Sequence, residues 1–167
     1  MQRILSIIFA ILLIVAIGCS QGPPRPAGFP VIIPCRIIVL QDGVPLAGAD
    51  VVLVPVNPTG TVWAVGGQTN DSGVAVMRTH GEHVGAPIDH FNVVVTKFER
   101  EVLRPEGETT GPMGGMYIPE IANLYDLVDP VFGSASTTTL QIEVARGTPE
   151  HTVDVGAAVR ILRRQPG

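Results

Sequence analysis

The sequence has few aromatic and few charged residues. Aromatic side chains make up 5% of the 167 residues and charged ones 16%, whereas 46% are hydrophobic. Disordered chains have the opposite balance, and coiled coils are dominated by Ala, Glu, Lys and Leu, so both classes are excluded. The formal net charge of −4 argues against a nucleic-acid partner, which requires a basic surface to replace phosphate counterions.

Long hydrophobic runs are also scarce. The longest, Ile4–Ile17, is fourteen residues that are apolar except for Ser6. A helix that spans a bilayer needs about 20 apolar residues. A short run that follows a basic start and precedes small residues is typical of a secretory signal. We therefore predict a signal peptide over residues 1–18.

Cysteine occurs only twice, and the first instance closes this run. The segment Ala16-Ile17-Gly18-Cys19 resembles the lipobox of bacterial lipoproteins, in which the cysteine is diacylated and becomes the new N-terminus. The resemblance implies lipidation of Cys19 and an exported protein anchored to a membrane, in the periplasm or on the cell surface. Cys35 would then lack an intramolecular partner and act as a small buried hydrophobe. A disulfide between Cys19 and Cys35 is the alternative if lipidation does not occur.

Proline and glycine are abundant, with 15 and 19 residues respectively. Prolines crowd residues 19–33, which predicts a semi-extended tether behind the lipid anchor. After Pro34, short β-rich runs alternate with turn residues, and no convincing helical periodicity appears. Ile121–Val128 and Val159–Arg164 are the weak helix candidates, the second within a C-terminal tail over 157–167.

The β-rich runs predict an all-β domain over residues 34–156. Their spacing favours a seven-stranded, Ig-like or transthyretin-like β-sandwich, although periodicity alone leaves a small barrel open. The expected strands are Cys35–Leu40, Ala49–Val56, Thr61–Gln68, Val74–Thr79, His90–Phe98, Leu140–Ala145 and His151–Val155.

Three motifs support this architecture. The segment Asp42–Val51, the turn Gln68–Gly73 and the strand Phe91–Lys97 resemble, in order and spacing, the carboxypeptidase regulatory-like domain. Behind a lipobox, they are similar to small exported lipoproteins of planctomycete-type bacteria. The resemblance implies a transthyretin-like sandwich and leaves the activity open, because one fold hosts many functions.

A long insertion over residues 99–139 precedes the last two strands. It carries both tyrosines, Tyr117 and Tyr125. Loops of this length are often functional, so one interpretation is a partner-binding or ligand-binding loop with the tyrosines as contacts. The other is a flap that covers a sheet edge.

Few residues suggest chemistry. His80, His83 and His90 are weak metal candidates, because no regular element is predicted to bring the first two together. Trp63 either fills the core or stacks on a sugar ring. No catalytic set and no cofactor motif is found.

We therefore predict a non-enzymatic, lipid-anchored module with a binding or structural role in the cell envelope. Its partners would be the membrane, through Cys19, and an envelope protein or glycan. The alternative is a metal-dependent or other enzyme that uses the His80–His90 loop or the Tyr117–Tyr125 insertion.

Overall fold

The computed structural model describes residues 23–59, 62–104, 106–109 and 116–163. Within these ranges the protein is all-β, with about half of the chain in strands (50%) and one 3-10 turn, η1 (Pro130–Gly133). The predicted all-β class is confirmed, and the antiparallel sheets are consistent with a β-sandwich. The described residues contain no helix long and apolar enough to cross a membrane. The predicted signal peptide and Cys19 lie outside the described residues.

One sheet has six strands, all antiparallel to their neighbours. Its order is β15-β10-β4-β5-β7-β8. The strands are β4 (Asp50–Pro55), β5 (Val65–Gln68), β7 (Arg78–Thr79), β8 (His83–Val84), β10 (Asp89–Thr96) and β15 (Gln141–Val144).

The second sheet is built around β2 (Arg36–Gln41), which pairs with β3 (Val44–Pro45), β6 (Val74–Val76) and β16 (Glu150–Asp154). The pairing of β16 with β2 is parallel. The expected strand Val74–Thr79 is divided between the sheets, because β6 pairs with β2 whereas β7 pairs with β5. Met77, between them, donates its backbone N–H to the Cys35 carbonyl at 3.0 Å.

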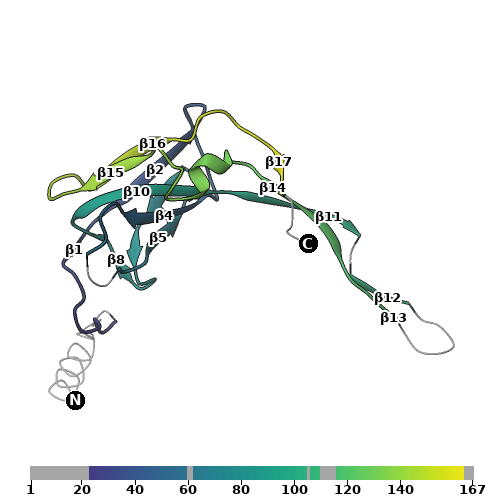
Figure 1. Cartoon of the computed structure of the whole chain (residues 1–167), viewed down its shortest axis with the longest axis horizontal. Helices are drawn as coiled ribbons and strands as arrows, with labels where there is room; N and C mark the ends of the chain where they lie inside the picture. The colour runs from purple at the N-terminus through teal and green to yellow at the C-terminus, as the bar shows by residue number, and fades with distance from the viewer. Residues whose placement is uncertain (1–22, 60–61, 105, 110–115, 164–167) are drawn as a thin grey trace, which may run out of the picture.

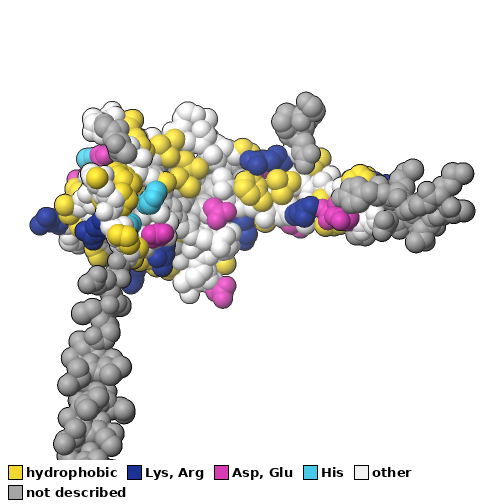
Figure 2. Space-filling view, turned by 90° about the horizontal axis from the view of Figure 1, so that it is seen from below, with side chains coloured by type: hydrophobic (Ala, Val, Ile, Leu, Met, Phe, Trp, Pro, Cys, Tyr) yellow, Lys and Arg dark blue, Asp and Glu magenta, His cyan; other side chains and the backbone are white. Residues whose placement is uncertain are grey.

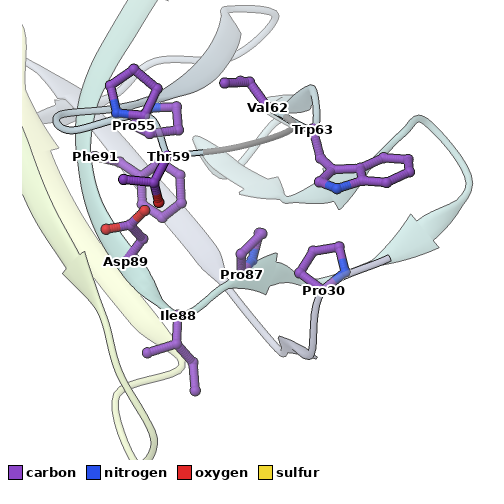
Figure 3. A pocket seen from close by; sticks show the side chains of 10 residues that line it. Pro30, Pro55, Thr59, Val62, Trp63, Pro87, Ile88, Asp89 and Phe91 are labelled. Carbon is purple, nitrogen blue, oxygen red and sulfur yellow. The ribbon is translucent and has the colours of Figure 1, made fainter. Parts of the chain in front are cut away.

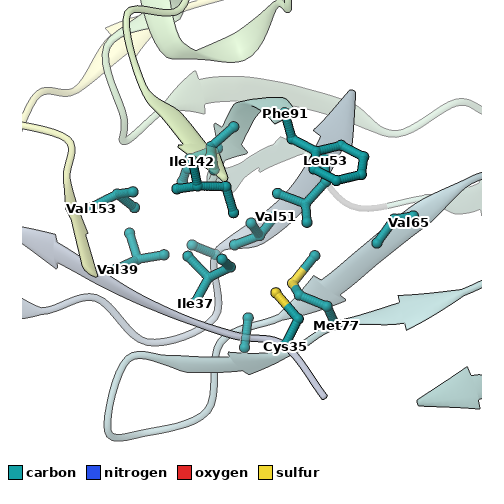
Figure 4. Close-up of a cluster of buried hydrophobic side chains, with 14 of the residues drawn as sticks. Cys35, Ile37, Val39, Val51, Leu53, Val65, Met77, Phe91, Ile142 and Val153 are labelled. Carbon is teal, nitrogen blue, oxygen red and sulfur yellow. The ribbon is translucent and has the colours of Figure 1, made fainter. Parts of the chain in front are cut away.

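The core lies between the two sheets. Alternate residues of β2, β4 and β10 are buried, as period-2 alternation requires when one face of a strand packs against another layer. Figure 4 shows these side chains meeting from opposite sheets. The most fully buried large side chains include Phe91, Ile37, Leu53 and Met77.

The N-terminal segment joins the sandwich before residue 34. β1 (Ile32–Ile33) pairs with β9 (Ala86–Pro87). Gly85, just before β9, has φ +124°, and a Cβ atom there would lie 2.5 Å from the Ile33 carbonyl oxygen. Glycine is therefore required where these two segments cross. Strand pairing thus begins within the segment expected to be tether.

The insertion forms a projecting arm, which Figure 1 shows extending from one end of the sandwich. The arm consists of β11 (Phe98–Arg104) paired with β14 (Ile121–Asp126), followed outward by β12 (Gly107–Thr109) paired with β13 (Met116–Ile118). β11 follows β10 after a single residue, Lys97. The arm is thus a continuation of a central strand of the sandwich.

The insertion divides into two parts. The described residues of 99–126 belong to the projecting ribbon, whereas the residues after β14 pack on β10: Val128 is buried in the core, and Thr138 donates its hydroxyl to the Val93 carbonyl at 2.8 Å. Among the described residues of the insertion, a sheet edge is therefore covered only by this second part. The two weak helix candidates are wrong, because both segments contain strands: Ile121–Val128 contains β14, and Val159–Arg164 contains β17 (Ile161–Leu162), which pairs with β14. Pairing with β11 determines the conformation of β14, overriding a weak local preference.

Candidate functional site

The arm has two chemically different faces. Directly paired residues in an antiparallel ribbon lie on the same side, so the register assigns each side chain to a face. One face, which we call the apolar face, carries Phe98, Val102, Ala122 and Leu124, together with the charged residues Arg100 and Asp126. A shallow depression on the arm is lined in part by Arg100, Ala122 and Leu124.

The opposite, polar face carries Glu99, Glu101, Asn123 and Tyr125, with Ile121 at its outer end. Between Val102 and Arg104 the register shifts, so that the extra residue, Leu103, is unpaired and 58% exposed. Every residue of β11 is exposed. An isolated two-stranded ribbon is only marginally stable in water, so the arm depends on what holds its base and on what contacts its faces.

Arg160 holds the base of the arm on the polar face. Its Cζ atom lies 3.6 Å from the centroid of the Tyr125 ring, and its Nε donates to Glu99 at 2.9 Å. The hydrogen bond to Glu99 raises the pKa of Arg160 above its usual value. Tyr125 in turn donates its hydroxyl to Glu101 at 2.9 Å and accepts from Asn123 at 3.2 Å. The polar groups of this expected contact residue are therefore engaged within the chain.

Arg163 holds the same base from the apolar face. Its Cζ atom lies 4.5 Å from the centroid of the Phe98 ring, and its Nε lies 3.7 Å from a carboxylate oxygen of Asp126. Backbone bonds reinforce the junction: Leu127 donates to the Lys97 carbonyl at 2.9 Å, and the Gln41 side chain donates to the Leu127 carbonyl at 2.9 Å. The C-terminal strand thus clamps both sides of the arm.

A pocket of about 200 Å³ lies at the other end of β10. Trp63 and Phe91 contribute aromatic surface, and Asp89 and Thr59 contribute the polar groups (Figure 3). The remaining lining residues are all apolar and mostly proline: Pro30, Pro55, Pro58, Val62, Pro87 and Ile88.

Trp63 is half-buried in a cluster of aromatic rings. Its ring centroid lies 5.1 Å from that of Phe29, edge to face, and 5.7 Å from that of His80. Phe29 also packs against His83, with centroids 4.5 Å apart. Such contacts stabilise by about 0.5–1.5 kcal/mol beyond burial alone. They fix Phe29, and with it the incoming chain, against the sandwich.

The three histidines have different surroundings. His83 is buried against Phe29, whereas His80 is exposed in a turn and His90 is exposed 3.7 Å from Glu143. The described part of the chain holds no group of three or more His, Cys, Asp or Glu side chains placed to bind a metal.

The structure does not gather the expected binding residues into one site. Trp63 lines the pocket near the start of β10, whereas Tyr125 lies at the base of the arm beyond its end. Tyr117 pairs with Glu108 through the backbone near the outer end of the arm. The apolar face of the arm was missed, although Phe98, Arg100 and Val102 alternate with Glu99 and Glu101 in the sequence.

No protein-family model matches the chain, and no curated protein sequence or solved structure matches it either.

Proposed function

We propose that this protein is a lipid-anchored, non-catalytic β-sandwich module of the cell envelope, and that the apolar face of its arm binds a partner protein. The observation that carries the proposal is the ordered ribbon beyond the sandwich, clamped at its base, with apolar side chains left in solvent. On this face Phe98 and Val102 are 38% and 47% exposed. Exposed apolar surface of this kind is characteristic of interaction sites.

We propose further that the β-sandwich is of a specific type. The order of the strands, the Asp42–Val51 and Gln68–Gly73 turns, and the Phe91–Lys97 strand support a transthyretin-like sandwich of the carboxypeptidase regulatory-like kind. The parallel pairing of β16 with β2 makes β16 the edge strand of the second sheet, beside β2, the first long strand of the chain.

Charge on β11 favours a different protein over a second copy as the partner. The free edge of β11 could pair with another β11 only about a two-fold axis perpendicular to the ribbon, which matches residues symmetrically about a central one. The three registers with the greatest overlap are centred on Arg100, Glu101 or Val102. The first opposes Arg100 to itself, the second opposes Glu101 to itself, and the third opposes Arg100 to Arg104. Like charges opposite each other destabilise a strand pair.

Crosslinking in intact cells, followed by capture and mass spectrometry, tests the proposal. We expect one stoichiometric envelope protein with the native chain, and its loss with Val102→Glu, which places a charge at the centre of the apolar face. Val44→Glu is the matched control, because Val44 is equally apolar and 64% exposed but lies on β3 of the sandwich. Equal capture by both variants would contradict the arm as the binding surface.

A further inference from the structure

The end of the sandwich near Trp63 exposes several large apolar side chains. Val31, Val62, Val84 and Ile88 are 67%, 55%, 53% and 48% exposed. Val62 and Ile88 line the same pocket as Trp63. The end of the sandwich that bears β1 and β8, on the left of Figure 2, shows hydrophobic side chains interspersed with basic and acidic ones.

The described chain enters the sandwich at this end. Phe29 is fixed there by Trp63 and His83, and Ile32 follows in β1. Only residues 20–28 are therefore left as a tether between Cys19 and the docked Phe29. Ten residue steps of about 3.3–3.6 Å reach at most about 35 Å. A tether this short keeps the end that bears it at high effective concentration beside the bilayer to which Cys19 is attached.

We propose that this end of the sandwich, with Trp63 at its centre, lies in the interfacial region of the membrane beside the lipid anchor. The inference rests on the proposed anchoring through Cys19. Tryptophan favours the interface between hydrocarbon and water, because its large ring is apolar and its N–H is polar. Exposed valine and isoleucine side chains gain by leaving water at the same depth.

Apolar contact, with little electrostatic attraction, would hold this end on the membrane. Arg25 and Arg78 are exposed here, but so are Glu82 and Glu143. Because charges of both signs are mixed, the attraction to anionic lipid is weak and the contact depends little on salt. β10 begins at the pocket with Asp89 and leads through Lys97 into β11. A sandwich resting on this end therefore directs its arm away from the bilayer.

The single tryptophan makes the test direct. The full-length lipidated protein is reconstituted into phosphatidylcholine vesicles whose acyl chains are brominated at a shallow position, and Trp63 emission is compared with that in unbrominated vesicles. We expect emission to be quenched by the brominated lipid and Trp63 to be shielded from acrylamide. The double variant Val62→Glu/Ile88→Glu should lose the quenching while remaining vesicle-bound, and Val44→Glu should keep it.

Each other outcome overturns the inference. Vesicle-bound native protein without quenching shows that Trp63 does not contact lipid, and leaves the anchoring intact. Equal quenching in the double variant shows that the apolar end does not make the contact. A change in emission only with soluble envelope glycan assigns the pocket to a sugar. A protein that fails to sediment with vesicles refutes the anchoring through Cys19, and this inference with it.

Discussion

The guanidinium carbon of Arg160 lies 3.6 Å from the centre of the Tyr125 ring, and the Arg160 Nε donates to Glu99 at 2.9 Å. Arg160 directly precedes β17, Tyr125 lies in β14, and Glu99 lies in β11. One arginine therefore joins three segments at the base of the arm. The arm is a ribbon of only two strands for most of its length, so its order depends on this junction.

Replacing this arginine should loosen the arm and spare the sandwich. In Arg160→Gln we expect faster amide hydrogen exchange in β11 and β14, with unchanged protection in β4 and β10, because the sandwich core does not include Arg160. Arg146→Gln is the matched control at an exposed arginine of the β15–β16 turn. A uniform loss of protection across both regions would contradict a local role for the clamp.

Glycine 85 should be intolerant of a side chain. In Gly85→Ala the new Cβ would lie 2.5 Å from the Ile33 carbonyl oxygen at a φ of +124°. Backbone strain alone costs about 1–3 kcal/mol, and the clash must also separate β1 from β9. We expect a loss of about 3 kcal/mol or more in the free energy of unfolding, measured with urea.

Gly81→Ala separates strain from clash. Gly81 also has a positive φ, +76°, but no atom lies within 4 Å of its Cβ position. In Gly81→Ala the free energy of unfolding should fall by only about 1–2 kcal/mol, the cost of a left-handed conformation. Equal losses at the two positions would show that β1 does not pack as described.

The buried thiol of Cys35 should make stability fall at alkaline pH. Cys35 is 1% exposed, and burial raises its pKa from the ordinary value of 9.0 to about 11. Above pH 9 the unfolded chain releases the thiol proton while the folded chain retains it, so the unfolded state is favoured as pH rises through about 11. A difference of about two pKa units corresponds to roughly 2–3 kcal/mol.

Urea unfolding of native protein and Cys35→Ala between pH 8 and pH 12 measures the contribution of the Cys35 thiol to the pH dependence of stability. The variant removes the thiol, so its stability should fall less steeply over that range. Parallel curves for the two proteins would contradict a thiol that stays protonated in the folded core.

Phe29 should hold the incoming chain against Trp63. In Phe29→Ala we expect the Trp63 emission to shift to longer wavelength and acrylamide quenching to rise, because the ring loses its edge-to-face neighbour and gains solvent. Phe98→Ala, at the base of the arm, is a control that should leave the emission unchanged. An unaltered spectrum in Phe29→Ala would mean that the cluster does not order this segment.

The strands of the sandwich could be predicted because packing one face of a strand against the core imposes a period of two on its apolar residues. Val93 and Val95 face the core while Asn92 and Val94 face outward, and this alternation is visible in the sequence. The two-sheet path of residues 74–79 could not be predicted, because the switch at Met77 depends on a backbone bond to Cys35, which is far away in the chain.

The arm was not predicted for a related reason. Residues 98–102 do alternate in the sequence, but β11 is exposed throughout, so its pattern does not mark a core-facing strand, and its partner β14 begins 17 residues after Arg104. The pocket likewise combines Pro30, Pro55 and Pro87 with Trp63. Such assemblies depend on non-local pairing, which local patterns do not encode.

The most direct test of the arm as a partner-binding surface is position-resolved photo-crosslinking in intact cells, with one photoreactive residue at a time along the arm. We predict adducts with a single envelope protein at Phe98, Arg100 and Val102, and few or none at Glu99 and Glu101, because successive side chains of a strand point to opposite faces. Val44 serves as the control on the sandwich. Adducts without this period of two, or adducts as strong at Val44 as at Val102, would contradict partner binding by the apolar face of the arm.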